Sequence, residues 1–165
     1  MLEIKGVSLS FNKGTVNEKQ ALCDINLTVN DGDFITVIGG NGAGKSTLLN
    51  IISGVFPPDG GEILLSGKNI TGLKEYKRAK YISRVFQDPL SGTAASMNIE
   101  ENLALADRRG KRRGLKWGMK KSELATYKEL LKGLELGLED RTGQKVETLS
   151  GGQRQALTLL MAVMK

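Results

Sequence analysis

The chain has 165 residues, with 39% hydrophobic and 25% charged side chains, which is the composition of an ordinary globular domain. A single cysteine, Cys23, excludes a disulfide within these residues, and the lack of histidine excludes a histidine base or metal ligand. The first residues do not resemble a signal peptide, and the longest apolar run is far below the ~20 residues that span a bilayer. We therefore expect a soluble chain from a reducing compartment, folded as one globular domain with room for a small subdomain.

The net charge of +6 is concentrated in one segment. Residues 108–121, RRGKRRGLKWGMKK, hold eight basic side chains and no acidic one, whereas the remaining residues are slightly acidic. Such a run is typical of a solvated surface loop. Two other interpretations stay open. One is a loop near anionic lipid headgroups, where Trp117 would suit the interface. The other is a nucleic-acid contact, which the lack of interleaved aromatic residues disfavours.

The first third of the chain alternates apolar and polar residues in the way that strands do. The apolar members of the two predicted strands are Ile4, Val7, Leu9 and Phe11, then Leu22, Ile25, Leu27 and Val29. After the turn signal Asp31-Gly32, the run from Phe34 to Ile38 is short and continuously apolar, which favours a buried parallel strand. A short helix, LLNIISG, is predicted at 48–54 and ends on a glycine.

Between that strand and that helix, GGNGAGKST satisfies G-x-x-x-x-G-K-[ST] in the strand–loop–helix context that the pattern requires. Glycines let the backbone wrap a phosphate with its N–H groups inward, and the helix N-terminus adds partial positive charge. Lys45 should reach the β- and γ-phosphates, and the Ser46 hydroxyl should bind Mg²⁺. A glycine-rich turn without a ligand is the plain alternative. The predicted nucleotide-binding residues are Gly39, Gly40, Asn41, Gly42, Ala43, Gly44, Lys45, Ser46 and Thr47.

The rest of the chain changes from strands to helices. Residues 56–70, FPPDGGEILLSGKNI, predict a turn and a strand, 73–80 a helix, and 81–87, YISRVFQ, a further strand. NIEENLALA begins with a capping box and predicts a helix from Asn98. SELATYKELLKGLELG, at 122–137, predicts a helix with one apolar face. That face consists of Leu124, Tyr127, Leu130, Leu131 and Leu134. Strands followed by helices indicate an α/β core and then a helical subdomain.

SGGQ, near the last residues of the sequence, fits another capping box, with Ser150 as N-cap and Gln153 three residues later. A capping box does not need Gly151 and Gly152, and each glycine costs a helix roughly 1 kcal/mol relative to alanine. Glycines do leave the N-terminal N–H groups open to the close approach of an anion. From these residues alone, a merely capped helix and an anion site are both open interpretations.

Together these motifs resemble those of the ATP-binding cassette (ABC) family of ATPases. GGNGAGKST is similar to that family's Walker A motif, LSGGQ (149–153) to its signature motif, and Gln87 in VFQD to its Q-loop glutamine. Phe11 stands where the family places an adenine-stacking aromatic residue, usually tyrosine. Phenylalanine keeps the ring and loses the hydroxyl, and an apolar strand residue is equally well explained as core. The resemblance covers essentially the whole chain, in the family's order.

The resemblance implies an α/β fold, namely a P-loop NTPase (RecA-like) core with an antiparallel β subdomain and a helical subdomain. It divides the chain into a nucleotide-binding core with Walker A at 1–87, a helical subdomain at 88–148, and the signature motif with its helix at 149–165. The family continues into a Walker B strand, with a Mg²⁺-binding aspartate and a catalytic glutamate, which these residues lack. We therefore expect a chain cut before Walker B, an incomplete sheet, a poorly covered last helix and very slow hydrolysis.

In that family, ATP and Mg²⁺ are held between Walker A of one subunit and the signature motif of another. Carried over, Lys45 and Ser46 hold the nucleotide and Mg²⁺ in this chain, while Gln87 senses the γ-phosphate and Mg²⁺. The residues that would contact the nucleotide of a second subunit are Ser150, Gly151, Gly152 and Gln153. Both nucleotide sites are then half-sites, so the resemblance implies a dimer closed by ATP.

The function implied is that of the ATP-binding subunit of an ABC transporter, which couples ATP binding and hydrolysis to transport by separate transmembrane permease subunits. Such a subunit is peripheral at the cytoplasmic face of the cell membrane, and an importer also uses a substrate-binding protein. GQKVET lacks the T-E-V-G-E-x-G pattern of many exporter cassettes, which favours import. The alternative is a soluble ABC ATPase that acts on nucleic acid or the ribosome. The short interval between Gln87 and LSGGQ argues against the DNA-repair members, with their long coiled coils, and we expect no nucleic-acid partner.

Overall fold

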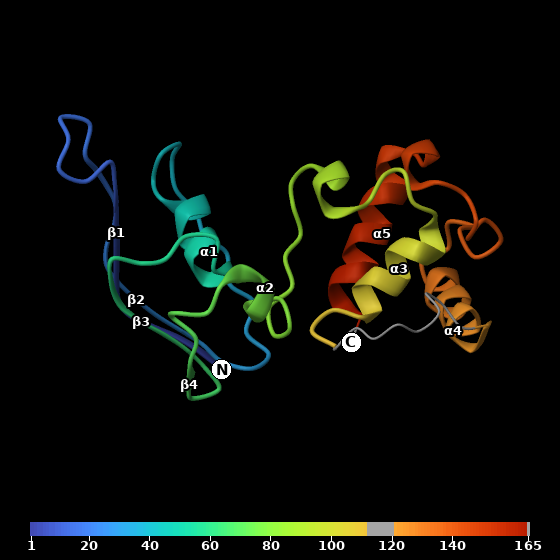
Figure 1. Cartoon of the computed structure of the whole chain (residues 1–165), viewed down its shortest axis with the longest axis horizontal. Coiled ribbons are helices and arrows are strands. Elements are labelled where there is room, and N and C mark those ends of the chain that lie inside the picture. Colours follow the sequence, from blue (N-terminus) through green and yellow to red (C-terminus); the bar gives the residue numbers. More distant parts are fainter. Residues whose placement is uncertain (112–120, 165) are drawn as a thin grey trace. The chain divides into compact units, whose positions relative to one another are not determined.

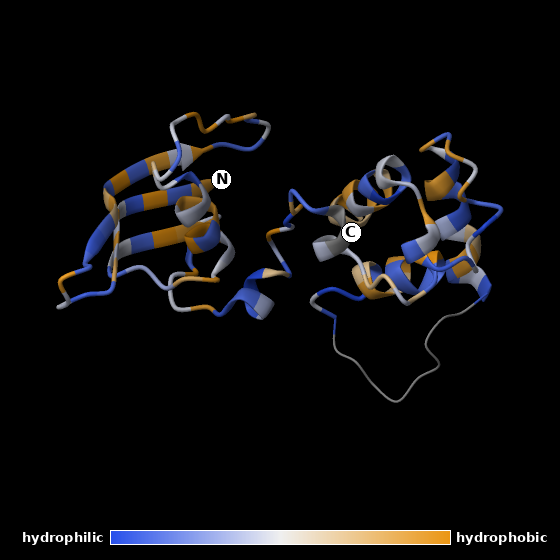
Figure 2. Ribbon diagram, turned by 90° about the horizontal axis from the view of Figure 1, so that it is seen from above, coloured by the Kyte–Doolittle hydropathy of each residue, from blue (hydrophilic) through white to orange (hydrophobic). Residues whose placement is uncertain are grey.

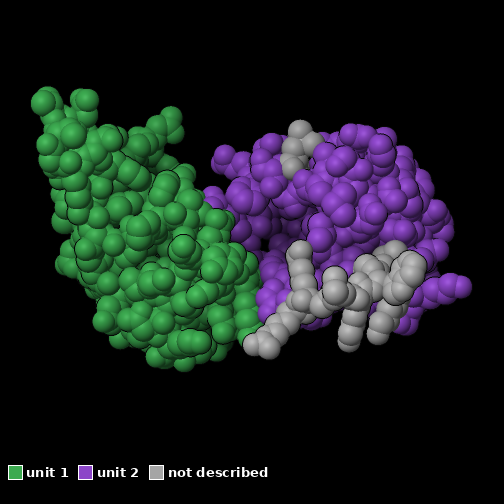
Figure 3. All heavy atoms as spheres, viewed as in Figure 1, with its two compact units in different colours: residues 1–82 green, residues 83–165 purple. Residues whose placement is uncertain are grey.

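The computed structural model describes residues 1–111 and 121–164. The chain forms two compact units, Met1–Ile82 and Ser83–Lys165, which Figure 3 shows in different colours. Each unit has a hydrophobic core of its own. Among the described residues, no helix combines the length and the apolar character needed to cross a membrane.

The first unit is built on a four-stranded antiparallel sheet (Figure 1). Its strands are β1 (Leu2–Phe11), β2 (Lys19–Val29), β3 (Gly60–Leu65) and β4 (Lys68–Asn69), in the order β2-β1-β3-β4. Apolar and polar residues alternate along much of β1 and β2, and Figure 2 shows this banding on strands of the sheet. On β1, Ile4 lies opposite Leu27 of β2 and Ile63 of β3. The predicted first two strands, the strand within 56–70 and the antiparallel β subdomain are therefore confirmed.

Helix α1 (Lys45–Ser53) packs its apolar face against this sheet. The buried core consists of Leu48 and Ile51 of α1 together with Ile4, Val7, Leu9, Leu22, Ile63 and Ile70. The helix ends at Gly54, whose φ of 86° is left-handed and whose N–H donates to the Ile51 carbonyl. The predicted helix with its glycine stop is confirmed, and it begins earlier than predicted, at Lys45.

A buried cation also holds the C-terminal end of α1. Arg78, in the short helix α2 (Glu75–Arg78), is 1% exposed and donates to the carbonyl oxygens of Ile51 and Ile52 at 2.7 and 2.9 Å. It also donates to the carbonyls of Thr71 and Leu73, at 2.7 and 2.8 Å. Burial lowers the pKa of Arg78, while the partial negative charge at the C-terminus of α1 favours its cationic form. The guanidinium thereby ties α2 to the helix that follows the glycine-rich loop.

Two predicted strands are wrong. Neither 34–38 nor 81–87 is a strand, and Phe34 and Ile38 are 93% and 91% exposed. A central parallel strand needs strands on both sides to pair its N–H and C=O groups. Within the described part of the chain, the assigned strands all belong to the antiparallel sheet, so the apolar run before the loop has no strand to pair with.

The second unit is helical. Its elements are η1 (Pro89–Gly92), α3 (Ile99–Asp107), α4 (Lys121–Lys132), η2 (Val146–Thr148) and α5 (Gly151–Val163). The buried core between them consists of Ile99, Leu103, Ala104, Tyr127, Leu131, Leu138, Val146, Leu149, Leu157 and Leu160. The helix predicted from Asn98 is confirmed with its capping box. Buried Asn102 accepts from the Ala94 N–H and donates to the Ala94 and Asn98 carbonyls, which fixes the loop before α3.

The helix predicted over 122–137 ends at Lys132. Glu135 takes a left-handed φ of 55°, which ends the helical run before the predicted limit. The apolar face is also narrower than predicted, because Tyr127 and Leu131 are buried but Leu130 is 38% exposed.

Candidate functional site

The loop of residues 39–44 has a backbone path that requires glycine. Gly42 and Gly44 have φ of 81° and 84°, in the left-handed region. The loop also lies close to β2, because a Cβ atom on Gly44 would be 2.6 Å from the Ala21 carbonyl oxygen and 2.9 Å from Leu22 Cδ2. The sequence therefore folds this loop tightly between the edge of β2 and the start of α1.

Lys45, the first residue of α1, folds back over the loop. Its Nζ donates to the carbonyl oxygens of Gly39 and Gly40, each at 2.7 Å. An ammonium has three N–H donors, so these two bonds hold the charge at the loop and leave one donor for an anion. The orphan N–H groups at the start of α1 lie at the same place, and together they fit a phosphate group.

The hydroxyl residues after Lys45 complete this cradle. Ser46 is exposed and Thr47 half-buried in the first turn of α1. Within residues 1–111 and 121–164, there is no cluster of three or more His, Cys, Asp or Glu side chains that could hold a metal ion. Mg²⁺ commonly binds one or two protein ligands with the remaining positions taken by water and phosphate oxygens. Ser46, exposed in the first turn of α1, offers one hydroxyl oxygen of the kind that Mg²⁺ accepts as such a ligand.

Phe11 packs against the core of the first unit and is partly exposed at its surface. It is half-buried, and its ring meets that of Phe56 edge to face, with centroids 5.5 Å apart and an interplanar angle of 81°. It is the last residue of β1 and lies opposite Lys19, the first residue of β2. Both readings of this residue, a core ring and a ring for stacking a base, are compatible with these contacts.

The predicted capping box at α5 is confirmed. Ser150 Oγ accepts a hydrogen bond from the Gln153 N–H at 3.3 Å, and Gln153 Oε1 accepts from the Ser150 N–H at 3.2 Å. A Cβ atom on Gly151 or Gly152 would meet nothing within 4 Å, and neither glycine has a positive φ. Nothing in the described packing therefore calls for glycine at these two positions.

A residue that sequence reasoning missed supports this helix start. Arg154 donates to the carbonyl oxygens of Glu147 and Leu149, at 3.1 and 3.0 Å, and so fixes the backbone before the cap. Gly92 allows η1 to approach α5, because a Cβ atom there would lie 2.6 Å from Thr158 Cγ2. Arg154 and the buried Arg78 gave no distinctive signal in the sequence, since a basic residue in a helix is usually solvated.

The predicted site residues fall into both units. Phe11 and the loop 39–47 belong to the first unit, whereas Gln87 and residues 150–153 belong to the second. Gln87 is exposed, in an irregular segment before η1.

Basic residues at the start of 108–121 have partners inside the second unit. Arg108 pairs with Glu123 at 3.0 Å, and Lys111 pairs with Asp107 at 3.0 Å. Arg109 donates to the Met161 and Met164 carbonyls, both at 3.1 Å, at the C-terminus of α5. Residues 112–120, and with them Trp117, lie outside the described residues, so the three interpretations of the run stay predictions.

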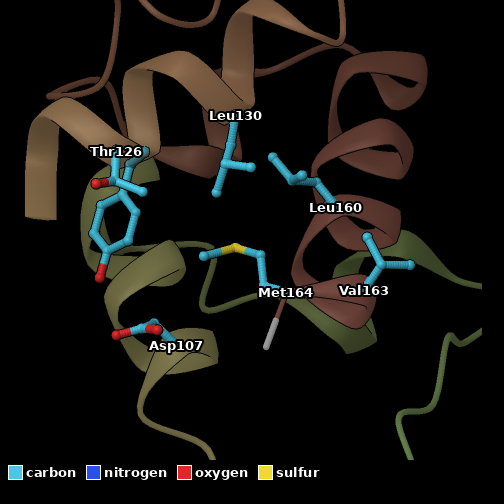
Figure 4. Close-up of a pocket in the computed structure, with 7 residues that line it drawn as sticks. Asp107, Thr126, Leu130, Leu160, Val163 and Met164 are labelled. Carbon is cyan, nitrogen blue, oxygen red and sulfur yellow. The ribbon is translucent and has the colours of Figure 1, made fainter.

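The second unit also contains a cavity of about 340 Å³ between α3, α4 and α5 (Figure 4). It is lined by Asp107, Thr126, Tyr127, Leu130, Leu160, Val163 and Met164. Tyr127 is 2% exposed, and its hydroxyl has no hydrogen-bond partner among the described residues. Burial raises the pKa of Tyr127, and the nearby carboxylates of Asp107 and Glu123 raise it further. The cavity holds none of the predicted nucleotide-binding residues.

Comparisons with known proteins agree with the motifs. The family profile described as "ABC transporter" matches residues 22–165. The "Tyrosine transport ATP-binding protein" of Clostridioides difficile (strain R20291) is 44% identical over 162 residues, which are 98% of this chain and 64% of that protein. The "Methionine import ATP-binding protein MetN" of Corynebacterium efficiens is 36% identical over 168 residues, or 98% of this chain and 43% of that protein.

Solved structures give the same result for the fold. The structure titled "Dimeric Structure of MJ0796, a Bacterial ABC Transporter Cassette" superposes with a TM-score of 0.79 at 29% identity, covering 99% of this chain and 69% of that one. A nucleotide-free ATP-binding cassette from an ABC transporter superposes with a TM-score of 0.76 at 30% identity. The chain spans about 64% of the length of the tyrosine-transport relative. With a P-loop NTPase cassette fold, a family profile over most of its length and both motifs in place, the chain belongs to the ABC transporter family.

Proposed function

We propose that this chain is the ATP-binding part of an ABC transporter and that its glycine-rich loop binds MgATP. The observation that carries the proposal is the Lys45 ammonium, held at 2.7 Å by two loop carbonyls at the N-terminus of α1. A positive charge, a helix N-terminus and a loop with two positions that favour glycine meet at one point, and the triphosphate of ATP suits all three.

The roles of individual residues follow from that placement. The third N–H of Lys45 donates to the β- and γ-phosphates, and the Ser46 hydroxyl joins the coordination of Mg²⁺. Thr47 is a further phosphate contact, Phe11 offers a ring to the adenine, and Gln87 senses the γ-phosphate and Mg²⁺. Bound Mg²⁺ supplies charge neutralisation at the phosphates.

The start of α5 is proposed as the second half of a site in another copy. Ser150, Gly152 and Gln153 would contact a γ-phosphate held by that copy's loop. The open space around Gly151 and Gly152 supports this role, because their own unit gives no reason for glycine. The dimeric cassette MJ0796 provides a precedent for two copies in the same fold. A domain division at 1–87, 88–148 and 149–165 follows from these roles.

The partners proposed are a second nucleotide-binding subunit and transmembrane permease subunits, with the chain peripheral at the cytoplasmic membrane face. An importer would add a substrate-binding protein, and the two sequence relatives described above carry tyrosine-transport and methionine-import names. Because both names are for transport, the alternative of a soluble ATPase acting on nucleic acid or the ribosome gains no support.

The residues assigned to the nucleotide include no carboxylate and no histidine, so they offer no ordinary general base for hydrolysis. We expect a protein of these 165 residues to bind MgATP but to release phosphate very slowly. Steady-state phosphate release would be measured beside a version extended with the continuation of the Clostridioides difficile relative. Equal turnover by the two proteins would overturn this expectation.

Nucleotide binding itself is tested by Lys45→Met. This substitution removes the ammonium from the loop. We expect the Kd for MgATP to rise by about tenfold or more, because charge-assisted bonds to phosphate are strong. The measurement is equilibrium competition against a fluorescent ATP analogue. Lys5→Met is the control, since it removes an ammonium that pairs with Glu3 at the surface. Equal affinity of wild type and Lys45→Met would contradict the proposed site.

A further inference from the structure

The first residue of β2 reaches the glycine-rich loop. A Cβ atom on Gly42 would lie 3.7 Å from Nζ of Lys19. The neighbouring residues of β2 approach the same loop, since the Ala21 carbonyl and the Leu22 side chain lie next to Gly44. Two glycines of the loop therefore independently place the beginning of β2 beside the predicted phosphate cradle.

The Lys19 ammonium has no counter-ion in the described structure. It makes no ion pair or hydrogen bond within residues 1–111 and 121–164, although a carboxylate stands next to it in the sequence. That carboxylate, of Glu18, accepts from the Gly14 N–H at 3.0 Å. By contrast, Lys13 in the same hairpin pairs with Asp59 at 2.8 Å.

This placement brings like charges together. Lys19, Lys45 and the partial positive charge of the α1 N-terminus all lie around one loop. Without an anion these positive charges repel one another. A bound polyphosphate would attract all of them and remove that repulsion.

We propose that Lys19 is a second phosphate-binding cation of the nucleotide site, reaching from β2 while Lys45 reaches from α1. The inference rests on the proposed binding of ATP. Lys19 is also the cross-strand partner of Phe11, and directly opposed residues of an antiparallel pair present their side chains on the same face. The end of the β1–β2 hairpin therefore offers a ring for the base and an ammonium for the phosphates together.

The test is a nucleotide series rather than one affinity. Competition binding would give Kd values for MgATP, ADP, AMP and adenosine with wild type, Lys19→Met, Lys19→Arg and Lys13→Met. We expect Lys19→Met to weaken MgATP about three- to fivefold, the size of an exposed charge pair, and to leave adenosine unchanged. The MgATP affinity of Lys19→Met should also fall less steeply with salt concentration than the affinity of wild type. Lys19→Arg should keep at least half of the affinity, and Lys13→Met should match wild type.

The outcomes separate this inference from the proposed function. One outcome is that Lys45→Met loses MgATP affinity while Lys19→Met and Lys13→Met have the same Kd for every nucleotide in the series. That result overturns the role of Lys19 and leaves nucleotide binding in place. If wild type binds none of the phosphorylated nucleotides, the proposed function fails and takes this inference with it. An equal loss for adenosine and MgATP would overturn a phosphate contact. If Lys19→Arg loses as much MgATP affinity as Lys19→Met, the positive charge is not what binds the phosphates. Thermal unfolding of each variant checks that it is folded.

Discussion

Two helices in this molecule begin with glycine-rich segments, and only the first of them needs glycine for the fold of its own unit. Before α1, Gly42 and Gly44 have left-handed φ, and a Cβ atom on Gly44 would lie 2.6 Å from the Ala21 carbonyl. At the start of α5, Gly151 and Gly152 have ordinary φ, with nothing within 4 Å of a Cβ position. The first pair is required by the fold of its own unit, whereas the second pair has no internal reason to be glycine.

The two helix starts also differ in how their N–H groups are satisfied. Before α1, the N-cap Gly44 has no side chain to accept a hydrogen bond, and a lysine stands at the first helical position. At α5, a neutral capping box between Ser150 and Gln153 satisfies two N–H groups within the chain. The first helix start is therefore charged and has no capping side chain, whereas the second is neutral and is capped within its own chain.

The largest expected effect is that of Gly44→Ala. An alanine there would adopt a left-handed φ, which costs roughly 1–2 kcal/mol, and would press against the Ala21 carbonyl. We expect the free energy of unfolding to fall by about 2–4 kcal/mol in urea titrations, together with loss of MgATP binding. Gly40→Ala is the matched control for stability alone, because its φ is not positive and a Cβ atom there meets nothing within 4 Å. An unchanged stability in Gly44→Ala would break the claim that the loop needs glycine for its own fold.

Local patterns predicted much of this structure from the sequence. The capping boxes at Asn98 and Ser150 and the glycine stop at Gly54 involve residues close in the chain, and the structure has all three. The alternation in β1 and β2 likewise predicted their buried faces, because a sheet with one covered face repeats every second residue. The nucleotide-binding roles of the motif residues remain predictions.

What failed depends on partners far away in the sequence. The apolar run 34–38 predicts a strand only if other strands pair with it, and a local pattern holds no information on that. The structural roles of Arg78 and Arg154 were also invisible, because four carbonyls and two carbonyls respectively converge on them only in the folded chain. Lys19 is similar, since only the folded hairpin places it beside Gly42.

The second prediction concerns the open helix start, and its two effects have opposite signs. Gly152→Ala fills empty space in a helical turn, so we expect the free energy of unfolding to rise by up to ~1 kcal/mol. The same methyl group would stand where the proposed γ-phosphate of a second copy approaches, so ATP-dependent self-association should weaken. Thermal unfolding and sedimentation with and without MgATP would measure the two effects.

Ser150→Ala supplies the comparison for this variant. It removes the cap and should lower the free energy of unfolding by about 1 kcal/mol, so stability and association fall together. A Gly152→Ala protein that loses stability would show that glycine is needed by the fold here too. The two helix starts would then no longer differ in whether their own fold requires glycine.

The smallest expected effect extends the comparison to the buried polar groups of the two units. Arg78 in the first unit donates to four carbonyls, whereas the Tyr127 hydroxyl in the second has no partner among the described residues. Removing an unpaired buried hydroxyl relieves a desolvation penalty, so Tyr127→Phe should leave the free energy of unfolding unchanged or raise it by up to ~1 kcal/mol at pH 8.

The pH dependence of stability gives a second measurement on this hydroxyl. Because the folded protein raises the pKa of Tyr127 above its ordinary value of 10.0, the folded state holds this proton more tightly than the unfolded state. Its contribution to stability is therefore complete below pH 10 and is lost as the pH rises through the folded-state pKa. Tyr127→Phe lacks this loss, so the stability difference in its favour should widen above pH 10. A Tyr127→Phe protein clearly less stable than wild type at pH 8 would instead place a bound water in the cavity, making the hydroxyl as well satisfied as Arg78.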